Sequence, residues 1–425
     1  MKTRVVITGL GVIAPNAYGV EAYEKALREG KSGISFQPEL KELNFGCQVA
    51  GVVQEYESIV RRYFSEEQLL GMNSSIKFAC IAATDAWKDA GLEIPGHDVD
   101  YVNWDTGAIV GTGIGGMDTI GDKLIPFTNA GKVRRMGSTM VEQVMASGVS
   151  AKISGLFALG NQVTTNSSAC STGTEAVIEA TNRIRQGFAK RMLAGGAEGI
   201  SKYIWAGFDA MRVLNRDRND EPEKASRPMS ESAGGFIPGS GSGIIMLESL
   251  DSALERKAKI YAEVVGTALN CGGQRMGGSM TAPNPESVRR CIREALKDAN
   301  IRPTQIDTIN GHLTATFADP YEVQNWVDAL EVAPKKLPLI NSTKSLVGHA
   351  LGAAGGLEVV ACALQLSRGF IHGSVNCEDL HEKIKPCEAS VVHKTQEVPG
   401  LEYQAKASFG FGDVNSCLIL KKWKG

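Results

Sequence analysis

The chain has 425 residues, 43% of them hydrophobic, and its formal net charge is −2. This length and apolar content predict a large buried core and two or three domains. The balanced charge lacks the basic excess that marks binding to nucleic acid or to a membrane surface, so neither is expected as a partner.

The first residues, MKTRVVITGLGVIAPNAYG, start basic and continue apolar, as a signal peptide does. Gly9 and Gly11 interrupt the apolar run, which favours a buried strand followed by a tight turn. No other stretch approaches the roughly 18 apolar residues of a membrane span. The nine cysteines form no C-x-x-C pair and show no metal-ligand spacing with the histidines. We therefore expect a cytoplasmic protein with no metal and no membrane insertion.

Further along the chain, short β-branched runs end in glycines and alternate with longer helix-like segments. The runs are RVVITGLGV, GAIVGTGIGG, RMLAGGAEG and GSGIIMLES. Buried strands that end in glycine-rich loops and are separated by helices are typical of an α/β fold.

Two segments in different halves of the chain resemble each other. CIAATDAWKDAGL and CIREALKDANI both predict a helix, which ends at Gly91 in the first and at Asn300 in the second. Each is followed by a strand with a glycine-containing turn, and then by a strand, a polar turn and a long helix. The shared order predicts a duplication, with halves at residues 1–255 and 256–425.

Cys170 lies in TTNSSACSTGTEA, after a strand-like stretch and before Val177, Ala180 and Ile184, which recur at helical spacing. The thiol is expected at the N-terminus of that helix. Free N–H groups and the helix dipole there favour a thiolate and predict a pKa below the free value of ~8.5. The alternative is a buried, inert cysteine, which is common for free thiols.

Two histidines occupy glycine-flanked turns of the second half, His312 in NGHLTAT and His349 in STKSLVGHALGAAGG. Taken singly, each could be a surface residue of a turn. If the halves are related by a pseudo-twofold axis, however, these turns and the turn of Cys170 converge at one site. Neutral imidazoles there could donate N–H bonds to a developing oxyanion, or one could act as a general base.

Three further features lie near these turns. Lys344 is either a solvated lysine or part of the site, paired with Glu322 or Asp319. GTGIGG lacks the spacing and the acidic residue of a dinucleotide loop, so no nucleotide is expected there. SFGFGDVNS contains Phe409 and Phe411, and either Phe411 gates a pocket or both rings simply pack.

Together these motifs resemble the β-ketoacyl-ACP synthases of the elongating type, which are condensing enzymes of the thiolase fold. The resemblance covers nearly the whole chain, in the blocks RVVITGLGVIAP, GKSGI, GTGIGG, SSACSTG, STKSLVGHALGAAGGLE and SFGFGDVNS. It implies an α/β thiolase-like fold in which two duplicated halves form α-β-α-β-α layers.

The reaction implied by this resemblance is a decarboxylative Claisen condensation. Cys170 would take an acyl group from an acyl carrier protein, and malonyl-ACP would lose CO2 to give an enolate that attacks the thioester. His312 and His349 look like the histidine pair that serves decarboxylation and condensation. Lys344 matches the family's active-site lysine, and Glu322 matches its partner acid.

Other residues match the family's substrate channel. The backbone N–H groups of Cys170 and Phe411 would form an oxyanion hole, and Phe411 matches the gating phenylalanine, with Phe409 beside it. Thr314 and Thr316 match the threonines that contact the phosphopantetheine arm.

The resemblance also implies the partners. It predicts acyl carrier protein as the carrier of both substrates, and it requires no redox cofactor or nucleotide. It predicts a homodimer with the strand near Cys170 at the twofold axis, or a heterodimer with a paralogue. The basic run GKVRRMG at 131–137 is a candidate contact for an acidic carrier protein.

The chain departs from the family pattern at several positions. Leu313 and Ala315 replace a glycine and a serine beside His312, and residues 230–240 lose several charges. Many members hold a monovalent cation near the position of Glu358, where Lys406 replaces a serine, and we expect its ammonium group to take the place of that cation. These departures leave the acyl substrate open between ordinary fatty-acid elongation and a specialised pathway making polyene or other secondary acyl chains.

Two other interpretations are weaker. A non-catalytic chain-length factor would lack the cysteine, whereas Cys170 and both histidines are present. A thiolase or a thioester hydrolase of the same fold is the other interpretation. A thiolase would carry a second catalytic cysteine near its C-terminus, whereas NCGGQRMGG, the stretch with a similar pattern, lies in mid-chain.

Overall fold

The computed structural model describes residues 2–96 and 100–425, and its main sheet has 11 strands. The strands from the first half of the chain are β1 (Val5–Ala14), β2 (Ala17–Tyr18), β5 (Thr106–Gly111), β6 (Val163–Thr164), β7 (Arg191–Glu198) and β8 (Gly241–Ser249). Those from the second half are β9 (Ala262–Cys271), β10 (Thr308–Asn310), β11 (Leu339–Asn341), β14 (Tyr403–Gly410) and β15 (Val414–Lys422).

The two halves of this sheet have the same topology. The strand order is β11-β10-β14-β15-β9-β1-β8-β7-β5-β6, with β2 beside β1. From the centre outward, β1, β8, β7, β5 and β6 correspond to β9, β15, β14, β10 and β11. In both halves the two inner pairings are antiparallel and the two outer ones parallel. The predicted duplication is therefore present in both strand order and strand direction.

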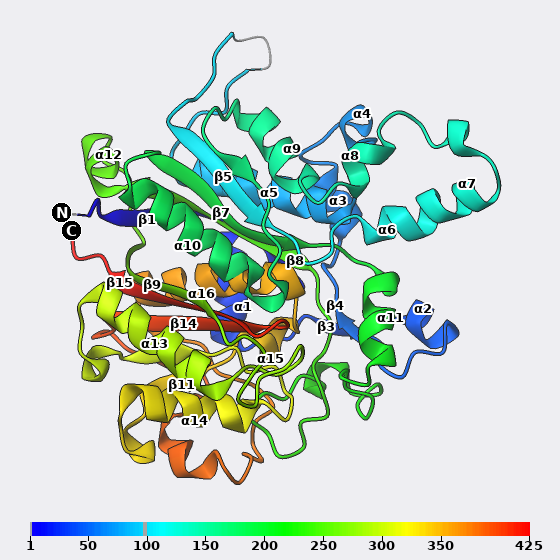
Figure 1. The fold of residues 1–425 in the computed structure, drawn as a ribbon. Helices are drawn as coiled ribbons and strands as arrows, with labels where there is room; N and C mark the ends of the chain where they lie inside the picture. The colour runs from blue at the N-terminus through cyan, green and yellow to red at the C-terminus, as the bar shows by residue number, and fades with distance from the viewer. Residues whose placement is uncertain (1, 97–99) are drawn as a thin grey trace.

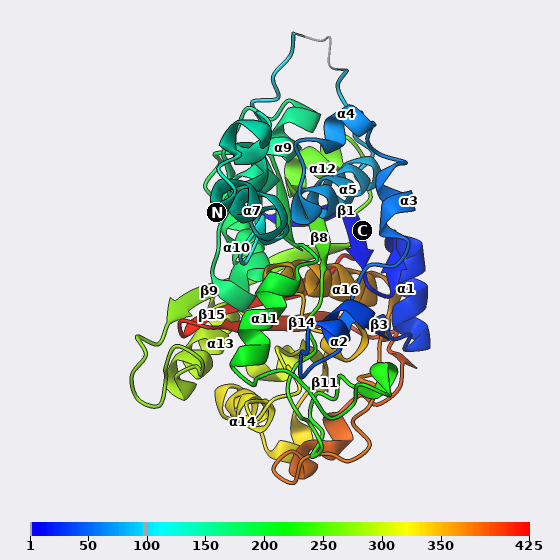
Figure 2. The ribbon, with the colours of Figure 1, turned by 90° about the vertical axis from the view of Figure 1, so that its right-hand side faces the viewer.

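Three layers of helices alternate with the two halves of the sheet (Figure 1). Helices α5 (Ser74–Asp89) and α9 (Gly148–Phe157) cover the outer face of the first half. Helices α13 (Pro285–Ala299) and α14 (Asp319–Leu330) cover the outer face of the second half. Helices α10 (Thr172–Arg185) and α16 (Ala354–Arg368) lie between the halves and contact strands of both. The α-β-α-β-α layering is also visible from the side in Figure 2.

Glycines allow the outer helices to pack closely on the sheet. A Cβ atom added at Gly9 of β1 would lie 2.1 Å from the carbonyl oxygen of Ala86 on α5, and one at Gly11 would lie 1.8 Å from that of Ala82. Both strand glycines are thus required by the approach of the helix, which explains why they interrupt an otherwise apolar strand.

The helix ends of the repeat lie as predicted. Helix α5 ends at Asp89 and is followed by Gly91 with a φ of 70°. Helix α13 ends at Ala299, and Asn300 closes it in the left-handed conformation with a φ of 53°. Glycine and asparagine tolerate this conformation better than other residues, so both act as helix stops.

The remaining helices and strands lie outside this layered arrangement or at its ends. They are helices α1 (Val20–Glu29), α2 (Pro38–Glu42), α3 (Tyr56–Val60), α4 (Glu66–Leu69), α6 (Met117–Thr119), α7 (Ile125–Asn129), α8 (Met140–Val144), α11 (Lys202–Ala210), α12 (Leu250–Glu255) and α15 (Lys344–Val347), and strands β3 (Ile34–Phe36), β4 (Val49–Gly51), β12 (Phe370–Ile371) and β13 (Gln396–Glu397). The segment from α6 to α8 projects from the body as an arm (Figure 1). Within the residues that the structure describes, no helix combines the length and the apolar character needed to cross a bilayer.

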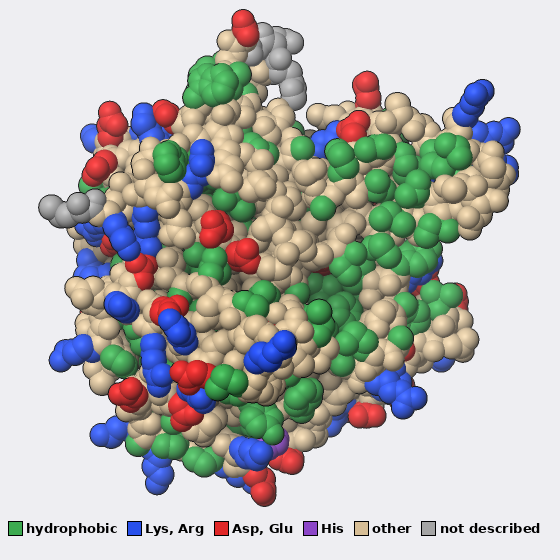
Figure 3. Space-filling view, viewed as in Figure 1, with side chains coloured by type: hydrophobic (Ala, Val, Ile, Leu, Met, Phe, Trp, Pro, Cys, Tyr) green, Lys and Arg blue, Asp and Glu red, His purple; other side chains and the backbone are tan. Residues whose placement is uncertain are grey.

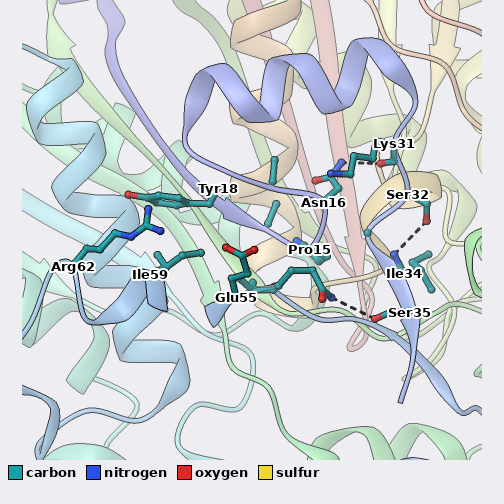
Figure 4. Close-up of a pocket in the computed structure, with 15 residues that line it drawn as sticks. Pro15, Asn16, Tyr18, Lys31, Ser32, Ile34, Ser35, Glu55, Ile59 and Arg62 are labelled. Carbon is teal, nitrogen blue, oxygen red and sulfur yellow. Dashed lines mark hydrogen bonds between the residues drawn. The ribbon is translucent and has the colours of Figure 1, made fainter. Parts of the chain in front are cut away.

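One cavity of about 350 Å³ lies beside the turn between β1 and β2, lined by the residues drawn in Figure 4. The backbone N–H of Gly33 in its wall donates to the carbonyl of Leu346 on α15 at 2.8 Å. The cavity contains no cysteine or histidine, so the chemistry predicted from the sequence lies elsewhere.

Candidate active site

The two halves of the chain together form a second cavity, of about 500 Å³, that contains Cys170, His312 and His349. Nitrogen atoms of the two histidines and the sulfur of Cys170 all lie within 4.8 Å of one another. Figure 3 shows hydrophobic side chains gathered around a hollow between α11 and the turn that joins β14 to β15. The predicted convergence of these three side chains is therefore present.

Cys170 comes from the first half and lies in a 3₁₀ turn, Ala169–Ser171, that leads directly into α10. The side chain of Thr172 accepts the N–H of Ser168 at 2.8 Å and donates to the carbonyl of Ala169 at 2.7 Å, which closes the turn. The thiol is thus at the helix N-terminus, as the sequence predicts.

The expected low pKa of this thiol is wrong for the unliganded site. Burial raises the pKa of Cys170 to about 11, because a thiolate would be removed from water. Lys344 and the backbone N–H groups of Phe411 and of Cys170 itself act in the opposite direction, but they do not outweigh burial. The resting side chain is a neutral thiol that must lose a proton during the reaction.

The histidine rings stand at right angles to each other, with centroids 5.4 Å apart and an interplanar angle of 84°. The backbone N–H of Leu351 donates to Nδ1 of His349 at 3.2 Å, so this nitrogen is an acceptor and the ring proton is on Nε2. Nε2 of His349 and Nδ1 of His312 are buried and have no hydrogen-bond partner among the described residues. Unpartnered polar atoms at a cavity are available to a substrate.

Both histidines are neutral at pH 7. Burial lowers their pKa values well below 6.5, and the positive charge of Lys344 lowers them further. The neighbouring imidazole adds to this effect for His312. A neutral imidazole carries one N–H group, and at this position that group can donate a hydrogen bond to an oxyanion.

Lys344 has a different partner from the one predicted. Its ammonium group forms a buried ion pair with Glu358 on α16. The prediction that Glu322 or Asp319 pairs with Lys344 is wrong, because both carboxylates accept backbone N–H groups instead. The sequence contained a usable signal, since Glu358 is the one acidic residue of a helix that is buried along almost its whole length.

Glu322 and Asp319 together hold the turn that carries His312. Glu322 accepts the N–H groups of His312 at 2.6 Å and of Leu313 at 2.7 Å. Asp319 accepts those of Thr314 at 2.9 Å and Ala315 at 3.1 Å. Burial raises the pKa of Glu322 to about 7 and that of Asp319 above its usual value. These two side chains thus hold the backbone of the turn that carries His312.

This turn is strained at the two positions that depart from the family pattern. Leu313 has a φ of 23° and Ala315 a φ of 63°, a region that side chains other than glycine rarely adopt. Leu313 is fully buried in the hydrophobic core of the second half and does not line the cavity. The N–H bonds to the two carboxyl groups and this burial offset the strain.

The other predicted residues line the cavity. Phe409, Phe411, Thr314 and Thr316 all contribute to its wall, together with Phe208 and Phe236, which the sequence did not single out. The hydroxyl groups of the two threonines are 3.0 Å apart. Most of the wall is apolar, which suits a chain of methylene or vinylene groups.

Two further groupings of ionisable side chains lie at or beside the cavity. The donor atoms of Cys170, His312 and His349 lie close enough together to hold a metal ion, although their separations in sequence match no metal motif. Lys406 lies beside Glu358, as predicted, with Nζ 2.6 Å from Oε2 of the carboxylate.

Comparisons with known proteins agree with this geometry. Residues 2–253 match the model of the N-terminal domain of β-ketoacyl synthases, and residues 261–378 match that of the C-terminal domain. The chain is 35% identical over 425 residues to 3-oxoacyl-[acyl-carrier-protein] synthase 2 of Vibrio harveyi, covering 99% of each chain. It is 33% identical to synthase 1 of Escherichia coli K12 over 424 residues, again covering 99% of each.

Solved structures give the same result. A structure described as the ishigamide ketosynthase/chain length factor matches with a TM-score of 0.88 and 32% identity over the full length of both chains. A ketosynthase of Burkholderia phymatum STM815 matches with a TM-score of 0.88 and 26% identity, covering 99% of this chain and 100% of that one. A type II polyketide ketosynthase in complex with its acyl carrier protein matches with a TM-score of 0.87 and 28% identity.

The fold and the site define a condensing enzyme of the thiolase fold, which confirms the predicted fold class. The chain belongs to the β-ketoacyl synthase family, and it is accordingly an acyltransferase.

Proposed function

We propose that this chain catalyses the decarboxylative condensation of malonyl-ACP with an acyl group carried on Cys170, giving β-ketoacyl-ACP and CO2. The observation that carries the proposal is the approach of the Cys170 sulfur to nitrogen atoms of His312 and His349 within 4.8 Å, in a mostly apolar cavity. The names of the relatives support acyl carrier protein as the carrier.

In the first half-reaction, Cys170 attacks the acyl thioester of the carrier protein. The thiol proton leaves through an imidazole and is delivered to the departing thiolate of the carrier, so the transfer is neutral overall. The N–H groups of Cys170 and Phe411, which face the sulfur, stabilise the oxyanion of the tetrahedral intermediate.

In the second half-reaction, malonyl-ACP enters and its carboxylate leaves as CO2. The electron pair of the broken C–C bond becomes an enolate, whose oxygen accepts the Nε2–H of His349 and a ring N–H of His312. The enolate carbon attacks the thioester carbonyl, and the Cys170 thiolate leaves and takes up one proton from solvent. Because both histidines are held neutral, they stabilise the enolate without protonating its carbon.

The acyl substrate has two candidate sources, fatty-acid elongation and a specialised pathway. The relatives named as fatty-acid-type synthases support the first, and the match to a type II polyketide ketosynthase supports the second. The apolar wall accepts either chain. Cys170 argues against a non-catalytic chain-length factor, because such a subunit needs no nucleophile.

The carrier protein is proposed to dock on the projecting arm. Lys132, Arg134 and Arg135 are exposed at its end, and none forms an ion pair with a residue that the structure describes. Lysine and arginine side chains gather at this end of the arm in Figure 3. A free basic cluster suits an acidic carrier, and its contribution should fall with added salt.

We propose that the protein forms a homodimer through an open edge of the sheet. Among the residues that the structure describes, strand β6 is the outermost strand of the first half and has a neighbour on one side only. Trp104 and Phe188, beside that edge, are 70% and 60% exposed. An open edge flanked by large apolar side chains is typically covered in the assembled protein. Light scattering checks this, and co-purification with a paralogue would instead indicate a heterodimer.

A cytoplasmic location is proposed from the cysteines. All nine are free, including the exposed Cys271, which suits a reducing compartment.

The test of the proposed reaction uses acyl-ACPs of several chain lengths and follows the intact mass of the protein. An acyl adduct on the peptide of Cys170 is expected, followed by CO2 release and a β-ketoacyl product when malonyl-ACP is added. The preferred chain separates the two substrate sources. Absence of an adduct with every acyl-ACP would refute the proposal.

A further inference from the structure

Lys406 is a fully buried lysine that the proposed chemistry does not use. It lies in the middle of β14, and its side chain has no exposed area. Lysine is almost never found at such a position without compensation, because an ammonium group loses its hydration on burial. The contacts of this side chain therefore have to explain why it is there.

The ammonium group makes two hydrogen bonds and one ion pair. Nζ donates to the carbonyl oxygen of Ala407 at 2.5 Å and to Oγ of Ser408 at 2.7 Å, and it lies 2.6 Å from Oε2 of Glu358. The protein thus replaces the water around the ammonium group with three oxygen atoms. The side chain is held in one place.

One of these contacts, the ion pair with Glu358, leads towards the loop of His349. Glu358 binds Lys406 through Oε2 and Lys344 through Oε1, and both ion pairs are buried. Lys344 precedes His349 by five residues, and its charge lowers the pKa of both catalytic histidines. Two lysines share one carboxylate. Burial lowers the pKa of Lys406 and the charge of Glu358 acts in the opposite direction, and with both ammonium groups protonated the cluster has a net charge of about +1.

Another contact leads to the cysteine turn. Ser408, which binds Lys406 through Oγ, also bonds the hydroxyl of Thr174 on α10 at 2.9 Å. Its carbonyl oxygen accepts the hydroxyl of Ser171 at 3.1 Å. Ser171 follows Cys170 directly. Lys406 is thus two contacts away from the turn of the nucleophile and two contacts away from the loop of His349.

We propose that Lys406 is a positioning residue. It couples the turn of Cys170 to the loop of His349 and supplies the site with an internal positive charge. It acts through Glu358 and Ser408 and touches no reacting atom. The charge stabilises the anions of both half-reactions, the Cys170 thiolate and the enolate, in a cavity where burial would otherwise disfavour them. The inference rests on the proposed function, which defines these half-reactions.

The test removes the charge in two ways. Lys406→Met keeps the length of the side chain, and Lys406→Ala leaves a hole that a small cation can enter. Lys421→Met on the neighbouring strand β15 is the matched control, because that lysine is partly exposed and lies outside the cluster. Acyl transfer to Cys170 and CO2 release from malonyl-ACP are measured separately, with the melting temperature recorded for each variant.

Both Lys406 variants are expected to slow each half-reaction by at least about tenfold, whereas the control keeps the wild-type rates. Ammonium or methylammonium ions should restore much of the rate of Lys406→Ala. They should not restore Lys406→Met, whose side chain fills the hole, and choline should restore neither because it is too large. A purely structural role would not give this dependence on cation size.

Wild-type rates in both variants would overturn the inference, and so would a loss that no small cation reverses in Lys406→Ala. If Lys406→Ala folds only when ammonium is present, the proposed role of Lys406 is supported. If it stays unfolded with ammonium, that role is refuted. A wild-type protein that shows neither half-reaction would refute the proposed function instead. In that case, the melting temperature of Lys406→Ala with and without ammonium would still test whether Lys406 holds the two turns together.

Discussion

The two halves of the chain share one topology but contribute opposite chemistry. The turn between β6 and α10 carries Cys170 and contains no charged residue, whereas the equivalent segment between β11 and α16 carries Lys344, His349 and, on the helix, Glu358. Helix α16 is buried along almost its whole length, so the charge of Glu358 has to be paired inside the protein. A duplicated scaffold thus separates the nucleophile from the acid–base groups and then brings them together in one cavity.

In both halves, burial favours the uncharged form of the reactive side chains. It raises the pKa of the thiol and lowers the pKa values of the histidines, so neither half carries a charge on its reactive group at pH 7. The ionisable groups beside them are the cluster of Lys344, Lys406 and Glu358 and the carboxyl groups of Glu322 and Asp319, which line the cavity. The variants below separate the roles of the two halves.

The largest effect is expected from the nucleophile of the first half. Cys170→Ala removes the atom that carries the acyl group, so condensation should fall by a factor of about 10³ or more. Intact mass should show no acyl adduct. Because the histidines are untouched, decarboxylation of malonyl-ACP should continue in this variant. Loss of CO2 release in Cys170→Ala would show that the two halves do not act separately.

The reciprocal change is made in the second half. His349→Ala removes the Nε2–H donor and should lower the rate of decarboxylation by a factor of about 10² to 10³. Transfer of the acyl group to Cys170 should be affected less. The two steps are compared by CO2 release and by adduct mass. An equal loss in both steps would contradict the assignment of this histidine to the enolate.

The cluster beneath the site should dominate stability. Glu358→Gln leaves two buried ammonium groups without their shared carboxylate and should lower the free energy of unfolding by ~3–5 kcal/mol. Glu397→Gln breaks an ion pair with Arg28 on the surface and should cost only ~0–1 kcal/mol. Urea denaturation of both variants measures the difference. Equal losses would mean that the buried cluster is not what stabilises this half.

The smallest effect concerns pH. His372 is buried, donates from Nδ1 to the carbonyl of Gly373 and contacts the hydroxyl of Thr343, and burial lowers its pKa to about 4. Its unfolded pKa is ~6.5, so between these values the unfolded chain binds more protons, and stability falls as the pH drops from 6.5 towards 4. His372→Gln should reduce that slope by up to ~1.4 kcal/mol per pH unit. Denaturation midpoints at pH 5 and 7 measure it, and parallel curves would contradict the prediction.

Local patterns were sufficient for much of the site. The glycines of β1, the helix stops at Gly91 and Asn300, and the repeated order of elements were readable because each follows from short-range sterics and periodicity. The turns of Cys170, His312 and His349 were found in the same way, from small residues and a repeated pattern.

Partners across the molecule were not predictable in this way. Glu322 and Asp319 follow His312 closely in sequence, yet they accept backbone N–H groups of its turn, and Lys344 pairs with Glu358 on α16 instead. Phe208 and Phe236 contribute to the wall from segments that carry no motif. Such choices depend on which side chains meet when the layers pack, and a linear pattern does not encode those distances.

The sequence by itself determined the class of fold, the duplication and the identity of the reactive side chains, because these depend on periodicity and on residue types in short motifs. The tertiary structure alone decided their ionisation and pairing. Burial between the two half-sheets removes water from the thiol, the imidazoles and the lysine–glutamate cluster, and the cost of keeping a charge there is set by depth and by neighbours from both halves. The neutral thiol, the neutral histidines and the shared carboxylate of Glu358 are consequences of that packing.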